Sequence, residues 1–335
     1  MRPLIAVPGT IAIVYRAYSR RSLTSSGLLV ATLTAVLHAL HPSSVPFTLL
    51  GTFFLAGTTA TKIKHDVKAT LTVSSSGNSG GEGPRTSIQV LANSGMASLL
   101  VLLHTWRYGL DQRTSCFGED EVADILLLGI VSNYAAVAAD TFSSELGILS
   151  KSPPVLITSL KTVPKGTNGG VSIAGLLAGV LGSAIIAIAA ALLLPFCGQH
   201  NSVLDKTKQI TGQQAAWSTQ EKVLLMVAIT IWGTFGSLLD SLLGALLQAS
   251  VVDERTGKVI ESSGGIKVLT GSQSARGSLK NNDHPSHGSR SIHSGRDILD
   301  NNQINLLMAA LMSIGGMVVA SSIWKVPENG LLSSR

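Results

Sequence analysis

Two acidic residues and a glycine-rich turn lie near the middle of the chain, each at the edge of an apolar segment. Asp140 and Glu145 stand at the end of one apolar run, and the sequence Pro-Lys-Gly-Thr-Asn-Gly-Gly-Val-Ser at 164–172 opens the next. Charged groups at the edge of hydrocarbon are costly, so they usually have a function. Carboxylates beside an anion-binding turn would suit Mg²⁺ together with a phosphorylated ligand.

The turn itself has features of a phosphate-binding loop. A helix N-terminus offers free N–H groups and a partial positive charge, and glycines let the backbone approach an anion closely. The alternative is an ordinary helix start with Asn168 or Ser172 as its N-cap. The Gly-Lys-Ser/Thr ending of a Walker motif is missing. Because lysines flank the turn, the predicted phosphate-binding set is Lys161, Lys165, Gly166, Thr167, Asn168, Gly169 and Gly170.

Polar residues also recur at helical spacing inside apolar segments. Asn133, Asp140 and Ser144 are seven and four residues apart and therefore share one helix face. Asp240 has no lysine or arginine within ten residues, so it needs a bound cation, a lysine from a loop or a proton. We predict Asp140, Glu145 and Asp240 as catalytic residues and Mg²⁺ ligands. The predicted supporting residues, which could instead be helix caps or interhelical hydrogen-bonding groups, are Asn93, Ser144, Ser237, Asp300, Asn301 and Asn305.

The composition indicates an integral membrane protein. Of the 335 residues, 45% are hydrophobic and 13% are charged, against about 25% charged residues in soluble domains. The apolar residues gather in runs long enough for membrane helices. The predicted fold is all-α, a polytopic transmembrane bundle of about eight helices within a range of six to eight. The candidate segments are 3–17, 26–40, 45–61, 88–108, 122–144, 171–196, 222–250 and 302–324.

The aromatic and cysteine content argues against a nucleic-acid-binding protein and against a fold built on cysteine-bound metal or a disulfide framework. Aromatic residues make up 4% of the chain, which is too few for the stacking surfaces that bind single-stranded nucleic acid, so no nucleic-acid partner is expected. The two cysteines, Cys116 and Cys197, show neither a metal-binding spacing nor a disulfide framework. The expected partner is the lipid bilayer, and the oligomeric state is left open.

The distribution of basic residues predicts the orientation of the bundle. The loops after the first, third, fifth and seventh segments hold 17 Lys and Arg residues, whereas those after the second, fourth and sixth hold 5. Lys and Arg favour the cytoplasmic side of a membrane. We therefore expect the odd-numbered loops in the cytoplasm and both termini on the other side. This arrangement places Asn93, Asp140, Asp240 and Asp300 at the cytoplasmic end.

One long polar stretch interrupts the pattern before the last segment. Residues 259–298 are rich in Ser, Gly, His and Asn and have no apolar periodicity, so they are predicted to be a disordered cytoplasmic insert. Residues 1–258 then hold the first seven transmembrane helices. Residues 299–335 hold the last helix and the tail of the same single domain.

Several motifs resemble the transmembrane protein 19 family. They lie at 139–147, 151–158, 163–172, 236–245 and 299–305, and the resemblance covers nearly the whole chain except 259–296. That family includes plant phytyl-phosphate kinase, which uses a nucleoside triphosphate to convert an isoprenoid monophosphate to the diphosphate. The chain departs from the kinase branch of the family at Phe142, Asn168 and Gly170.

The resemblance implies an isoprenoid-phosphate kinase at the cytoplasmic membrane face, with Mg²⁺ as cofactor and a nucleoside triphosphate as co-substrate. An endomembrane such as the endoplasmic reticulum is the expected location. The alternative is a multi-pass transporter or ion-binding protein that uses intramembrane Asp140 and Asp240. A kinase needs its polar groups at one membrane face, whereas a transporter places its site near the midplane.

Overall fold

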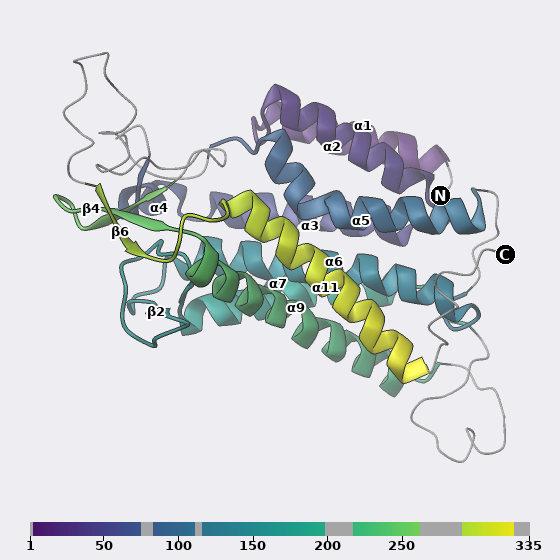
Figure 1. Ribbon diagram of the computed structural model, residues 1–335. Helices are drawn as coiled ribbons and strands as arrows, with labels where there is room; N and C mark the ends of the chain where they lie inside the picture. The colour runs from purple at the N-terminus through teal and green to yellow at the C-terminus, as the bar shows by residue number, and fades with distance from the viewer. Residues whose placement is uncertain (1–2, 75–82, 111–115, 198–216, 262–289, 325–335) are drawn as a thin grey trace.

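The computed structural model describes residues 3–74, 83–110, 116–197, 217–261 and 290–324. A bundle of long helices occupies most of this part of the chain (Figure 1). All eight predicted segments are helical, and the all-α membrane fold is confirmed. The helices are α1 (Pro3–Ser19), α2 (Ser25–Leu40), α3 (Val45–Lys62), α5 (Ser87–Tyr108), α6 (Glu121–Gly147), α7 (Ile173–Leu193), α9 (Thr219–Leu247) and α11 (Asn301–Trp324).

Five of the described helices, α5, α6, α7, α9 and α11, are long and apolar enough to cross a membrane, and α1 and α2 are shorter apolar helices. Helix α6 is the central one. Its most apolar window is 89% buried, against 22–39% for the other four, because α3, α5, α7, α9 and α11 all pack around it. The remaining helices expose apolar side chains outward, as helices facing lipid do.

Small residues allow the central helices to approach one another closely. A side chain on Gly182 of α7 would come within 2.5 Å of the Ala138 carbonyl oxygen on α6. A side chain on Gly236 of α9 would come within 2.5 Å of the Ala136 Cβ. Contacts of this kind drive helix association in a bilayer, where apolar burial alone gives no advantage over lipid. The small residues of α6 thus fix its position between α7 and α9.

A small sheet and the short helix α4 (His65–Leu71) lie at one end of the bundle (Figure 1). The sheet has the order β1-β5-β4-β6, and β5 pairs parallel with β1 and antiparallel with β4. A separate two-stranded pair joins β2 and β3. The strands are β1 (Val73–Ser74), β2 (Val155–Leu156), β3 (Gly170–Val171), β4 (Ser250–Asp253), β5 (Lys258–Glu261) and β6 (Arg290–Ser294).

These strands correct the prediction that residues 259–298 are disordered. Residues 259–261 belong to β5 and residues 290–294 to β6, and both strands are hydrogen-bonded to β4. The backbone groups of short, mixed segments are satisfied here by pairing across the sheet, and a search for apolar periodicity does not detect this. Residues 262–289 of the predicted insert lie outside the described residues.

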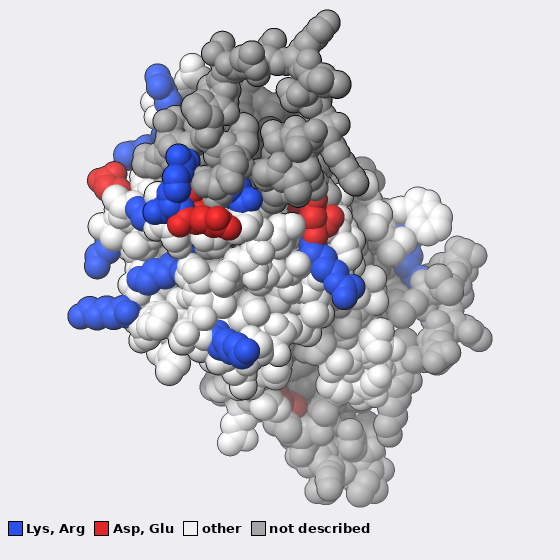
Figure 2. All heavy atoms as spheres, turned by 60° about the vertical axis from the view of Figure 1, so that its left-hand side comes forward, with Lys and Arg blue, Asp and Glu red and all other residues white. Residues whose placement is uncertain are grey.

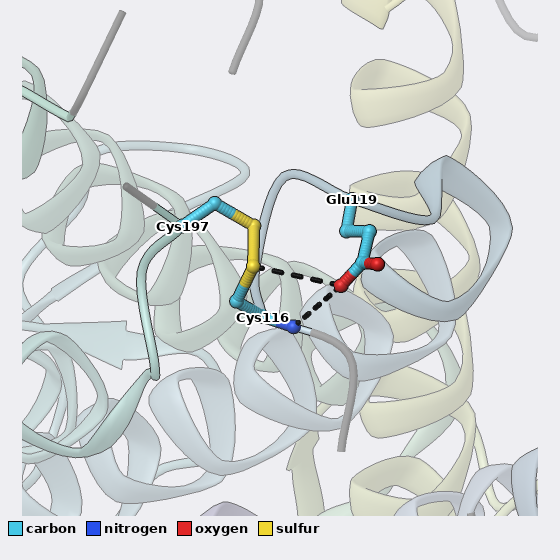
Figure 3. Close-up of side chains that lie close together, drawn as sticks. All are labelled: Cys116, Glu119 and Cys197. Carbon is cyan, nitrogen blue, oxygen red and sulfur yellow. Dashed lines mark hydrogen bonds between the residues drawn. A yellow bond between two sulfur atoms is a disulfide. The ribbon is translucent and has the colours of Figure 1, made fainter. Parts of the chain in front are cut away.

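A disulfide closes the opposite end of the bundle and corrects the cysteine prediction. Cys116, just before α6, is bonded to Cys197, just after α7, although 81 residues separate them (Figure 3). The pairing follows from the fold, because α6 and α7 are antiparallel neighbours and the start of one meets the end of the other. Glu119 accepts a hydrogen bond from the Cys116 backbone N–H at 3.2 Å.

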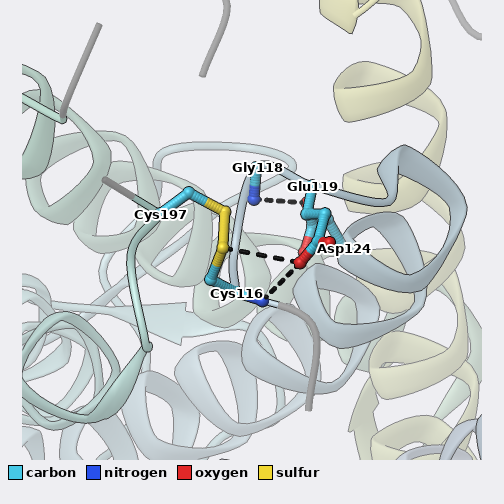
Figure 4. Close-up of a disulfide and its surroundings, with 5 residues drawn as sticks. All are labelled: Cys116, Gly118, Glu119, Asp124 and Cys197. Atoms are coloured by element: carbon cyan, nitrogen blue, oxygen red, sulfur yellow. Dashed lines mark hydrogen bonds between the residues drawn. A yellow bond between two sulfur atoms is a disulfide. The ribbon is translucent and has the colours of Figure 1, made fainter. Parts of the chain in front are cut away.

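The loop that carries Cys116 is held by a second carboxylate. Asp124 on the first turn of α6 accepts a hydrogen bond from the Gly118 N–H at 2.7 Å (Figure 4). The two sulfur atoms and the Glu119 carboxylate lie within 4.8 Å of one another. Because the sulfurs are bonded to each other, they are not thiolate metal ligands. This group therefore ties the loop to the bundle.

Candidate functional site: a polar cavity at the sheet end of the bundle

A cavity of about 830 Å³ lies among the helix ends beneath the sheet. Lys and Arg side chains gather on this end of the molecule, which Figure 2 brings forward. Most of the residues predicted from the sequence line the cavity, although they come from five separate segments. They are Asn93, Asp140, Ser144, Glu145, Lys165, Gly166, Thr167, Asn168, Gly169, Gly170, Asp240, Asp300, Asn301 and Asn305.

Asp140 and Asp240 meet in the cavity wall. Each lies seven residues before the last residue of its helix, α6 or α9, and therefore about 10 Å from the helix end. The two parallel helices are packed together, and the carboxyl groups of Asp240 and Asp140 lie close enough to interact. Like charges at this separation repel each other, so a proton or a cation at the pair would stabilise it. Among the described residues, Asp240 interacts with Asp140 and Asn305, and none of the described lysines pairs with it.

An asparagine on α11 completes this group. With its amide oriented so that the nitrogen faces acceptors, Asn305 donates to Asp240 Oδ1 at 3.1 Å and to the Asn301 carbonyl oxygen at 3.1 Å. Asn305 therefore orients the Asp240 carboxylate from a third helix. On α5, the backbone carbonyl of Asn93 accepts a hydrogen bond from the side chain of Asn133 at 2.9 Å, which fixes α5 against α6.

Glu145 is paired with a lysine. Its Oε2 accepts a hydrogen bond from Lys68 Nζ, and the two side chains are 11% and 7% exposed. Lys68 lies on α4 and also donates to the carbonyl oxygens of Ala60 at 3.3 Å and Thr61 at 2.6 Å. These are carbonyls of the last turn of α3, and Ala60 O also accepts from the backbone N–H of the C-cap residue Ile63 at 3.2 Å. Lys68 thus caps α3 and neutralises Glu145 at once.

The glycine-rich turn is largely occupied by its own contacts. The N–H groups of Thr167, Asn168 and Gly170 donate to Pro164 O, Ser250 Oγ and Thr167 O. The Asn168 side-chain amide donates to Ala249 O at 3.0 Å, which ties the turn to the start of β4. The N-cap of α7 is Ser172, whose Oγ accepts from Gly175 N at 3.1 Å. Most contacts of this turn therefore fit the alternative interpretation, an ordinary helix start with Ser172 as its N-cap.

Gly169 explains why glycine is needed in the turn. Its φ of +79° is in the left-handed region, and an added Cβ would lie 2.4 Å from Ala245 Cβ and 2.6 Å from Ser241 O on α9. Packing against α9 therefore excludes a side chain at this position. Lys165 is the member of the set whose charged group remains available at the cavity, although it donates one hydrogen bond to Ser150 O at 2.6 Å.

Three predicted residues take other positions or roles. Lys161 is exposed between β2 and β3 and does not line the cavity. Ser237 is buried between α9 and α7, close to Gly179, and does not reach the cavity either. Asp300 lines the cavity but acts as a helix cap, since it accepts from Gln303 N at 3.0 Å. Sequence reasoning missed Lys68 and Arg85, which it counted only as charges that orient the loops.

The bundle and its cavity define a polytopic helical membrane protein with a polar site at one end. The family described as integral membrane protein DUF92 matches residues 8–313, so the chain belongs to that family. The relatives found include members of the transmembrane protein 19-like family, which confirms the resemblance read from the motifs.

Three relatives show how far the similarity extends. Protein PGR of Arabidopsis thaliana is 32% identical over 313 residues, which cover 93% of this chain and 94% of that protein. Protein VTE6, chloroplastic, of the same plant is 32% identical over 165 residues, or 49% of this chain and 46% of that protein. An uncharacterized membrane protein of Methanocaldococcus jannaschii is 38% identical over 122 residues, or 36% of this chain and 40% of that protein. No solved structure matches the chain.

Proposed function

We propose that this protein transfers a phosphoryl group from a nucleoside triphosphate to an isoprenoid monophosphate in the cavity. The observation that carries the proposal is the contact between Asp140 and Asp240 in the wall of a cavity at one end of the bundle. Among the relatives, VTE6 is a phytyl-phosphate kinase, and its similarity extends over about half of this chain. Family membership and the position of the acids together favour this class of reaction.

The donor groups at the acid pair fit Mg²⁺. Asp140 and Asp240 offer carboxylate oxygens, and a hard cation is typically held by one or two carboxylates together with phosphate oxygens. Glu145, predicted as a third ligand, is already neutralised by Lys68, so we assign the metal to Asp140 and Asp240 alone. When bound there, Mg²⁺ would neutralise charge on the reacting phosphates.

The chain's own residues would position the two substrates. Asn305 holds Asp240 in a fixed orientation, and Lys165 presents a positive charge to the cavity. Phosphoryl transfer requires mainly positioning and charge stabilisation, so a site of this kind is sufficient. An isoprenoid tail would lie among the apolar helices while its phosphate reaches the polar helix ends.

The two ends of the bundle support a cytoplasmic position for the cavity. Disulfides persist in oxidising compartments and are rare in the cytosol, so the Cys116–Cys197 end would face the lumen of an endomembrane compartment such as the endoplasmic reticulum. The Lys- and Arg-rich loops lie at the opposite end, as the positive-inside rule requires. The cavity would then open toward the cytosolic nucleotide pool.

The test is incubation of the purified protein in lipid nanodiscs with Mg²⁺, γ-labelled ATP or CTP, and prenyl monophosphates of several lengths. We expect labelled prenyl diphosphate, and at least a 100-fold lower rate for Asp240→Asn. Asp66→Asn is the matched control, because the Asp66 side chain is fully exposed on α4 and outside the cavity lining.

The transporter interpretation makes the opposite prediction. Its site belongs near the midplane, whereas Asp140 and Asp240 lie about 10 Å from the helix ends beside surface loops. Failure to form diphosphate from any substrate, together with an ion flux in proteoliposomes that Asp240→Asn abolishes, would replace the kinase by a transporter.

A further inference from the structure

The basic residues at the cavity differ in how many of their donors are already used. A lysine ammonium has three N–H donors. Lys68 directs all three to acceptors of the protein: Glu145 Oε2, Ala60 O and Thr61 O. Lys68 therefore has no donor left for a ligand. It contributes to the shape of the site but not to anion binding.

Arg85 is the opposite case. Its side chain lines the cavity, and within the described residues its one side-chain hydrogen bond runs from Nη2 to Thr61 Oγ1 at 3.3 Å. Among the residues that the structure describes, no carboxylate forms a salt bridge with it. A guanidinium carries five N–H donors in a planar fork, so four of them make no hydrogen bond to the described part of the chain. A half-buried guanidinium without a counter-ion is typical of an anion-binding site.

The backbone of Arg85 is rigidly held. Its N–H donates to Ser22 O at 3.0 Å, and its carbonyl accepts from Thr24 N at 3.0 Å. An added side chain on Gly27 would lie 2.5 Å from that carbonyl oxygen, so this contact is closely packed as well. The next residue, Thr86, is the N-cap of α5. The loop between α1 and α2 and the start of α5 thus fix the position from which the guanidinium extends.

The guanidinium is directed toward the acid-bearing part of α6. Arg85 Nη2 and Thr141 Cγ2 lie 3.4 Å and 3.6 Å from the point where a Gly57 side chain would begin. Thr141 follows Asp140 directly in α6. Arg85 and Asp140 both line the cavity, so an anion held by Arg85 would share the cavity with the proposed metal ligands. Gly57 leaves the space on α3 that the guanidinium occupies.

We infer that Arg85, together with Lys165, binds the phosphate group of the ligand, in place of the amides of the glycine-rich turn. Arginine binds phosphate through two parallel N–H···O bonds, which fix its orientation as well as its charge. The phosphate could belong to an isoprenoid monophosphate or to a nucleotide, since both offer the same oxygen acceptors. The inference rests on the phosphorylated ligand of the proposed function but does not depend on phosphoryl transfer.

The experiment measures binding and not turnover. Full-length protein in nanodiscs is titrated with a short-chain prenyl monophosphate, with the matching prenyl alcohol, and with a non-hydrolysable ATP analogue. For Arg85→Gln we expect about 10- to 100-fold weaker binding of at least one phosphorylated probe and unchanged binding of the alcohol. The phosphorylated probe whose affinity falls identifies the source of the phosphate. Arg85→Lys should recover part of the affinity, because it restores charge without the planar fork.

Two further variants keep the inference falsifiable. Lys161→Gln removes a basic residue outside the cavity and should bind both phosphorylated probes like the wild type. Thr61→Val removes the hydroxyl that orients the guanidinium and should weaken binding about 3- to 10-fold if Arg85 is the receptor. Thermal unfolding of each variant separates a folding defect from lost binding.

The outcomes distinguish the inference from the proposed function. Equal affinity of Arg85→Gln and wild type for both phosphorylated probes would overturn the inference, as would the absence of binding by the wild type. Weaker phosphate binding without any diphosphate formation would leave Arg85 as the receptor and remove the kinase. Diphosphate formation by Arg85→Gln at an unchanged rate and with unchanged substrate affinity would support the kinase and remove Arg85 as the phosphate receptor.

Discussion

The Lys68–Glu145 pair gives the sharpest prediction about stability. Both side chains are almost fully buried, at 7% and 11% exposure, and the pair joins α4 to the end of α6. Replacing Lys68 by Met leaves Glu145 without the counter-charge of Lys68 and removes the Lys68 donor from Thr61 O, whereas Ala60 O keeps the N–H of Ile63. Breaking a buried ion pair on one side costs about 3–5 kcal/mol. We expect Lys68→Met to lower the free energy of unfolding by that amount.

The double variant separates the ion pair from simple packing. In Lys68→Met/Glu145→Leu no buried charge remains, and a buried pair replaced by apolar groups is often neutral in stability. The loss of the Lys68 hydrogen bond to Thr61 O still costs about 1–2 kcal/mol. The double variant should therefore be more stable than either single variant, with a coupling energy of about 2 kcal/mol or more.

The assay is equilibrium unfolding in mixed micelles with increasing SDS, followed by near-UV circular dichroism. Lys161→Met is the matched control, because Lys161 is exposed and should change stability by less than about 0.5 kcal/mol. Two results would refute the reasoning. The first is a Lys68→Met variant no less stable than the control, and the second is a double variant whose loss equals the sum of the two single losses.

Two more predictions concern the turn and the disulfide. Gly169→Ala and Gly257→Ala both place alanine at positive φ, but of these two glycines only Gly169 packs against α9. In an unfolding titration Gly169→Ala should therefore cost about 1–3 kcal/mol more stability than Gly257→Ala. Equal losses of stability would contradict the packing argument. Cys116 and Cys197 are the chain's two cysteines, so in sealed microsomes neither should react with a maleimide polymer before denaturation and reduction, and both should react afterwards. Labelling without reduction would exclude the disulfide. A variant with both cysteines replaced by serine, expressed at the wild-type level, controls for non-specific labelling.

The positions of the helices and the placement of Asp140 and Asp240 at one end of the bundle could be predicted because they depend on local information. A membrane helix must be a continuous apolar run, so its limits are visible in the sequence. Asp140 and Asp240 each lie seven residues before a helix end, and both helices run in the same direction. Equal depth on parallel helices brings the two acids to the same level. Their convergence needed only the helix count and the alternation of direction.

The remaining features depend on pairs that are distant in the sequence. Lys68 and Glu145 are 77 residues apart, and the two cysteines are 81 residues apart. Strand β1 at 73–74 pairs with β5 at 258–261, and neither segment has a pattern that identifies its partner. Such contacts result from the packing of elements whose positions are already fixed. Charge counting placed Lys68 and Arg85 at the correct end of the bundle but gave no indication of which one would be neutralised.

The sheet explains why polar residues at helix ends form a cavity and not an open surface. Val251 on β4 and Val259 and Ile260 on β5 line the cavity from the side of the sheet, opposite the acids on the helices. Apolar side chains beside the acids lower the local dielectric, which strengthens charge interactions inside the site.

The glycine-rich turn connects the two sides of that cavity. A side chain on Gly166 would lie 2.8 Å from Thr72 Cγ2 and 3.6 Å from Val259 Cβ, and one on Gly169 would overlap α9. Both glycines have positive φ, so the turn can pass between the sheet and α9 without side chains at these points. The Asn168 side chain then fastens it to the residue before β4. The turn that suggested a phosphate-binding loop therefore holds the sheet over the acids. Under our proposal, phosphate is bound instead by the side chains of Arg85 and Lys165.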